Sequence, residues 1–131
     1  FLSFFIVIDT IIYSNFIKLL GWGLTEYAGR ESKTLQKVDL NIISLQECSN
    51  TYPAVTNGNI CTYTPKKDTC QRDSGGPLLW QNPNTKRLVL AGIIVGGTGC
   101  ASDEPAINTR TGAYIDWILS VTSDARYCDI E

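Results

Sequence analysis

The stretch "DTCQRDSGGPLLW", residues 68–80, is the most informative part of this chain. It places Ser74 between an acid and a Gly-Gly pair, and an apolar run follows directly. Because Gly pairs usually mark a turn or a bulge, we expect one of these directly after Ser74. The 131 residues include no histidine, so this chain offers no imidazole that could activate the Ser74 hydroxyl.

Segments on both sides of this stretch have the pattern of short strands. Val38, Leu40 and Ile42 alternate with polar residues, which is the period of a half-buried strand. Downstream, "PLLW" at 77–80 and "RLVLAGIIV" at 87–95 are two apolar strand candidates. The Asn-Pro-Asn cluster between them predicts a turn, so the two strands should form a hairpin.

Two helices are predicted beside these strands. Ser44 and Glu47 form a capping-box pattern, which predicts a short helix that carries Cys48. After residue 110, apolar side chains recur at i, i+3, i+4 and i+7, so we expect an amphipathic helix packed on the strands, with Thr111 as its N-cap. Its apolar positions are Tyr114, Trp117, Ile118 and Val121.

Composition and charge indicate one globular domain in an oxidising compartment. Hydrophobic residues make up 44% of the chain and the formal net charge is −2, which argues against nucleic acid as a partner. Five cysteines without C-x-x-C spacing favour disulfides over a metal site and indicate secretion. We predict no cofactor and no metal. Because there is no methionine, we expect a processed chain or a piece of a longer one.

Residues 1–20 differ in character from the rest, because they are mostly apolar but are interrupted by Asp9, Asn15 and Lys18. A membrane or secretory segment is one interpretation, although a central Asp costs about 2.5–3.5 kcal/mol on insertion. A buried pair of strands is the second interpretation. The third, which we favour, is sequence foreign to the domain, from an alternative exon or a mistaken gene model.

The stretch around Ser74 closely resembles the active-site segment of the trypsin and chymotrypsin family of serine proteases. Segments on both sides of it also match the family's second half in order: "GWG" at 21–23, "AGIIVGGTGC" at 91–100, "PAINTR" at 105–110 and "YIDWI" at 114–118. The "PAINTR" phrase resembles one that insect trypsin-like proteases share. The resemblance covers residues 21–131 and implies an all-β fold. This fold is the second six-stranded antiparallel Greek-key barrel of the family, followed by a C-terminal α-helix.

The resemblance implies a role for each matched residue. Ser74 is the nucleophile, the backbone amides of Ser74 and Arg72 form the oxyanion hole, and Asp73 pairs with an ammonium released on activation. Asp68 forms the floor of a pocket that selects Arg or Lys. The implied substrate-binding residues are Asp68, Thr69, Gln71, Val95, Gly97 and Ala106.

The resemblance also pairs Cys48 with Cys61 and Cys70 with Cys100. It leaves Cys128 without a partner in this chain.

Several positions depart from the family pattern. Arg72 replaces the usual glycine, and Ala106 stands where trypsin has glycine. Val95 and Gly96 stand where many members have Ser and Trp. The family's catalytic His and Asp belong to the first half of its domain, and the matched residues begin after them.

We therefore predict the C-terminal half of a secreted trypsin-like endopeptidase, silent as this chain alone. Its expected partners are a protein or peptide substrate with Arg or Lys at the cleavage position and the missing N-terminal half-domain. Neither nucleic acid nor a membrane is an expected partner. The alternative hypothesis is a non-catalytic pseudo-protease that acts as a binding module or decoy.

Overall fold

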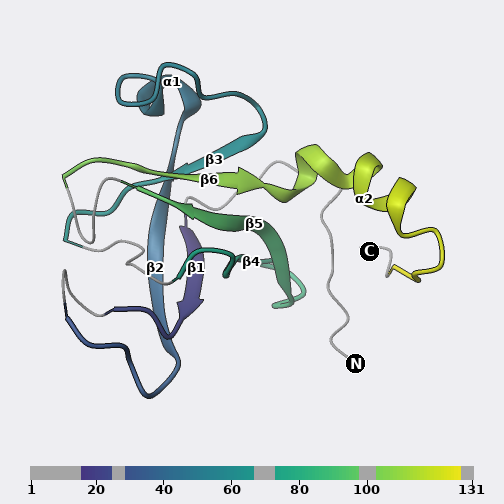
Figure 1. The fold of residues 1–131 in the computed structure, drawn as a ribbon, viewed down its shortest axis with the longest axis horizontal. Helices are drawn as coiled ribbons and strands as arrows, with labels where there is room; N and C mark the ends of the chain where they lie inside the picture. Colours follow the sequence, from purple (N-terminus) through teal and green to yellow (C-terminus); the bar gives the residue numbers. More distant parts are fainter. Residues whose placement is uncertain (1–15, 25–28, 67–72, 98–102, 128–131) are drawn as a thin grey trace.

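The computed structural model describes residues 16–24, 29–66, 73–97 and 103–127 (Figure 1). Six antiparallel strands form a closed barrel in the order β1-β2-β3-β6-β5-β4. The strands are β1 Phe16–Gly21, β2 Gln36–Ile43, β3 Asn59–Thr62, β4 Pro77–Gln81, β5 Leu88–Gly96 and β6 Ala106–Arg110. The short helix α1 spans Leu45–Cys48, a 3-10 turn η1 spans Thr111–Tyr114, and α2 spans Ile115–Val121.

The strand order confirms the predicted all-β barrel with a C-terminal helix. Strand β1 closes the barrel, because it pairs with β2 on one side and with β4 on the other. Strand β6 returns past the β4-β5 hairpin to lie between β3 and β5. This return brings the segment after residue 105 beside the end of β5, next to the turn that carries Ser74.

The core fills the barrel interior with side chains that alternate along the strands. In β2, Leu40 is buried while Val38 and Ile42 pack against the same core, as the period of two predicted. Closed barrels of this size are filled by side chains, so every strand contributes inward residues. The buried core residues are Ile17, Leu19, Leu40, Ile60, Leu78, Trp80, Val89, Ala91 and Ile94.

Residues 16–20 belong to the barrel. They form most of β1, and Ile17 and Leu19 are two of its buried core residues. Lys18, which interrupts the apolar run, points outward and forms an ion pair with Asp39 on β2 at 2.9 Å. The predicted division at residue 20 otherwise concerns residues 1–15, which lie outside the described residues.

The hairpin between β4 and β5 is confirmed, and the Asn82 side chain stabilises its turn. Oδ1 of Asn82 accepts hydrogen bonds from the backbone amides of Asn84 and Thr85 at 2.8 and 3.1 Å. Lys86 completes the turn with a φ of 59°. Asn favours such turns because its side chain bonds to the backbone two residues on.

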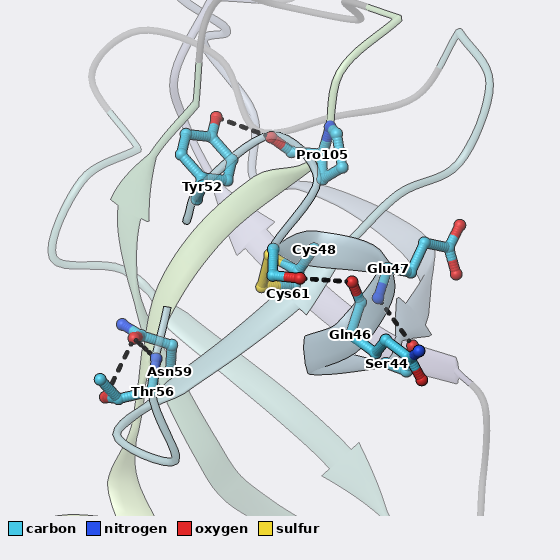
Figure 2. The surroundings of a disulfide bond; sticks show 10 residues. Ser44, Gln46, Glu47, Cys48, Tyr52, Thr56, Asn59, Cys61 and Pro105 are labelled. Carbon is cyan, nitrogen blue, oxygen red and sulfur yellow. Dashed lines mark hydrogen bonds between the residues drawn. A yellow bond between two sulfur atoms is a disulfide. The ribbon is translucent and has the colours of Figure 1, made fainter. Parts of the chain in front are cut away.

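The Ser44 half of the predicted capping box begins α1, and a disulfide anchors the helix to the barrel (Figure 2). Oγ of Ser44 accepts a hydrogen bond from the amide of Glu47 at 3.0 Å. One turn later, Cys48 is bonded to Cys61 on β3, and both residues are fully buried. This is the pair that the family resemblance implied.

The predicted packing of the last helix is wrong. Helix α2 extends away from the barrel (Figure 1), with Trp117 63% and Val121 59% exposed, and Tyr114 is exposed as well. Ile115 is buried instead, and Thr111 starts the 3-10 turn without capping it through its side chain. The helix itself is confirmed, but among the described residues nothing covers these three exposed side chains. In the part of the chain that the structure describes, no helix is long and apolar enough to span a membrane.

Candidate active site

Ser74 lies on a tight turn that joins a loop to β4. The carbonyl of Asp73 accepts a hydrogen bond from the amide of Gly76 at 2.9 Å, which closes a four-residue turn. Gly75 has a φ of +83°, as the third residue of a type II turn requires. The Gly-Gly pair is therefore explained by backbone geometry, and it leaves Ser74 exposed at the corner of the turn.

Strand β5 holds this turn from one side. The amide of Gly75 donates to the carbonyl of Ile94, and the amide of Ile94 donates to the carbonyl of Gly76, both at 2.9 Å. Oγ of Ser74 donates to the carbonyl of Val95 at 3.2 Å. The hydroxyl thus faces a backbone oxygen of β5, which orients it but cannot take its proton.

Asp73 points toward the "GWG" segment rather than toward solvent. Its Oδ1 accepts a hydrogen bond from the amide of Gly23 at 2.9 Å. A Cβ atom added to Gly21 would overlap Oδ1 of Asp73, and one added to Gly23 would lie 2.5 Å from its Cγ and both oxygens. Gly21 and Gly23, 52 and 50 positions before Asp73, therefore make room for the carboxylate next to Ser74.

The absence of a side chain at Gly23 leads to a testable prediction. Gly23→Ala should displace the Asp73 carboxylate and lower the free energy of unfolding by about 2 kcal/mol, as overpacking typically does. Urea denaturation measures the loss. In an Asp73→Ala background the same substitution should cost much less, because the overlapping atoms are gone. Equal costs in the two backgrounds would contradict this explanation.

Three of the predicted substrate-binding residues lie where β5 and β6 come together. A Cβ on Gly97 would contact Cα and Cβ of Ala106 at 3.3 and 3.4 Å, so these two positions are close neighbours. Ala106 is buried, whereas the side chain of Val95 is exposed. Their roles in substrate binding stay predictions.

The other predicted site residues lie outside the described residues. They are Asp68, Thr69, Gln71 and Arg72, together with the second proposed disulfide, Cys70 and Cys100, and with Cys128. The oxyanion-hole role of the Arg72 amide and the pocket-floor role of Asp68 therefore stay predictions. The described part of the site consists of the Ser74 turn, Asp73 with its glycines, and the end of β5.

The sequence interpretation missed Asn108, a polar residue inside the barrel. It is fully buried on β6, and its Oδ1 accepts a hydrogen bond from the amide of Val95 at 3.2 Å. The sequence did contain one indication. Asn108 lies two residues after Ala106 in a five-residue strand, so its side chain faces the barrel interior as that of Ala106 does. An amide at an inward position needs a hydrogen-bond partner, which sequence alone does not identify.

A family model described as Trypsin matches residues 15–118 of this chain. The chain belongs to the trypsin family. The family match extends over every strand of the barrel and includes the turn that carries Ser74.

Individual relatives of this trypsin-family chain include proteases from venom. Venom serine protease 34 of Apis mellifera is 50% identical over 115 residues, which are 88% of this chain and 28% of that protein. A venom serine protease of Polistes dominula is 41% identical over 114 residues, covering 86% of this chain and 41% of that protein. Clotting factor G beta subunit of Tachypleus tridentatus is 33% identical over 118 residues, covering 81% and 38%. The chain thus spans less than half of each of these relatives.

Proposed function

We propose that this chain is the C-terminal barrel of a secreted trypsin-like endopeptidase that cleaves after Arg or Lys. The observation that carries the proposal is Ser74, exposed at the corner of a turn whose backbone is bonded to β5. Family membership makes Ser74 the candidate nucleophile. Extracellular action fits the venom and clotting-factor names of the relatives.

The chain alone should be catalytically silent. It contains no histidine, and the described contact of the Ser74 hydroxyl is with a carbonyl oxygen. We propose that a half-domain outside this sequence supplies the base and the acid that orients it. Exposed Trp117, Val121 and Val95 are apolar side chains that such a partner would cover.

The same absence of histidine favours a second candidate, a non-catalytic binding module or decoy. Such a protein would use the pocket with Asp68 to hold basic side chains without cleaving them. The two candidates share the pocket and differ in whether Ser74 ever reacts with a substrate. Binding tests the pocket, and covalent labelling tests Ser74.

Benzamidine, a planar cation resembling the arginine head group, tests the pocket directly. We expect it to bind the folded chain, and Asp68→Asn should weaken binding by more than about tenfold, because a desolvated cation would lose its charged partner. Isothermal titration calorimetry measures both affinities. Asp103→Asn, which makes the same charge change at an exposed site, is the control and should leave binding unchanged. Equal effects of the two substitutions would contradict the Arg/Lys specificity.

A further inference from the structure

Strand β5 contains a bulge next to the Ser74 turn. Its register against β6 pairs Ile93 with Thr109 and Gly96 with Ile107, so Ile94 and Val95 together lie opposite Asn108. Two residues opposite one interrupt the ladder, and the extra residue loses its backbone partner on the neighbouring strand. Gly96 follows with a φ of +152°, a backbone conformation that residues with a side chain rarely adopt.

The side chain of Asn108 supplies the hydrogen-bond acceptor that the Val95 amide lacks at the bulge. The amide of Val95 donates to Oδ1 of Asn108 at 3.2 Å, in place of a carbonyl on β6. The orientation of the Asn108 side chain follows from this bond, because only its oxygen can accept from an N–H group. A backbone amide that the bulge left unpaired is thereby satisfied inside the barrel.

The same peptide group contacts the Ser74 turn on its other side. Its carbonyl, that of Ile94, accepts from the amide of Gly75 at 2.9 Å. The carbonyl of the next peptide, that of Val95, accepts from Oγ of Ser74 at 3.2 Å. A continuous hydrogen-bonded path therefore runs from Asn108 through the peptide between Ile94 and Val95 to the residue after Ser74. Hydrogen bonds in such a chain polarise and strengthen one another.

Burial makes an asparagine at this position costly. Asn108 is fully buried, its cross-strand neighbour is the apolar Ile60, and its Nδ2 has no hydrogen-bond partner among the described residues. A buried amide with an unsatisfied donor destabilises the folded state relative to an apolar residue of the same shape. A buried asparagine here is explained if its acceptor oxygen is needed by the Val95 amide.

We propose that Asn108 is a positioning residue that holds the Ser74 turn in place through the peptide between Ile94 and Val95. Its hydrogen bond is to the backbone amide of Val95 and not to Ser74 itself, so it acts on the turn indirectly. Its importance for catalysis rests on the proposed function of Ser74, but its structural action does not.

Amide hydrogen exchange of the whole chain, followed by NMR, tests this proposal. Asn108→Leu keeps the approximate shape of the side chain and removes the acceptor. The matched control is Thr62→Val, which removes a buried hydroxyl of the same barrel that has no partner among the described residues. Exchange at the amides of Val95 and Gly75 should be about tenfold faster in Asn108→Leu than in the control, equivalent to about 1.4 kcal/mol.

The comparison with other amides separates positioning from general destabilisation. Loss of global stability would accelerate exchange at protected amides throughout the barrel alike, including those of β1 and β4. Acceleration confined to Val95, Gly75 and their neighbours supports the proposal, whereas a uniform increase or no change overturns it.

A measurement on the unaltered chain keeps the proposal testable if Asn108→Leu does not fold. Scalar coupling across the hydrogen bond, between the Val95 amide nitrogen and the side-chain Cγ of Asn108, should be detectable. A Val95 amide that lacks this coupling and exchanges as fast as exposed amides would overturn the proposal. None of these measurements requires Ser74 to react. Their outcome therefore tests the role of Asn108 independently of the proposed protease function.

Discussion

The folded chain should remain unlabelled when it is incubated with a fluorophosphonate and its intact mass is measured. Such probes react with a serine whose proton is taken by a base, and the 131 residues contain no histidine. The hydroxyl of Ser74 instead donates to the carbonyl of Val95 at 3.2 Å. In another serine protease, loss of the histidine alone lowers turnover by about 2 × 10⁶, because the triad acts as a unit.

The controls for this experiment are a Ser74→Ala variant and a complete trypsin treated with the same probe. The folded state is checked first by dispersed amide resonances in an NMR spectrum. A mass increase that disappears in Ser74→Ala would mean that Ser74 is activated within this chain, and the proposal of a silent half-enzyme would be wrong. An unlabelled, folded chain that still binds benzamidine is the result we expect.

Removal of the disulfide between Cys48 and Cys61 should cause the largest loss of stability among the substitutions considered. The bond closes a loop with a sequence separation of 13, which restricts the unfolded chain. Chain-entropy reasoning assigns about 3 kcal/mol to a loop of this size. The double variant Cys48→Ala, Cys61→Ala should lose that amount, measured by urea denaturation.

Ser44→Ala is the matched control for this prediction, because Ser44 caps the same short helix. It removes the hydrogen bond to the amide of Glu47 and should cost only about 1 kcal/mol. A double cysteine variant that loses no more than Ser44→Ala would show that the bond contributes little. In that case the helix and the loop after it would be held mainly by other contacts, such as the Tyr52 hydroxyl donating to the carbonyl of Pro105.

Local sequence patterns predicted some of the elements of this protein, namely β2, β4, β5 and the two helices, but not β1, β3 or β6. The alternation of Val38, Leu40 and Ile42 predicted β2, because a strand in a barrel buries one face only. The capping pair Ser44 and Glu47 predicted α1, since that interaction lies within one turn of helix. The motif around Ser74 indicated the family, and with it the number and connection of the strands.

Only the tertiary structure decided how distant segments meet at the site. The contact of Asp73 with Gly23 joins residues 50 positions apart, and the bond from Val95 to Asn108 depends on a bulge in one strand register. Neither has a local signature, because each needs the barrel to be closed. The spacing of apolar residues likewise predicted α2, but Trp117 and Val121 are exposed and Ile115 is buried, because periodicity alone does not show which side chains a neighbouring element covers. Sequence determines short-range geometry, whereas partners across the barrel are set by packing.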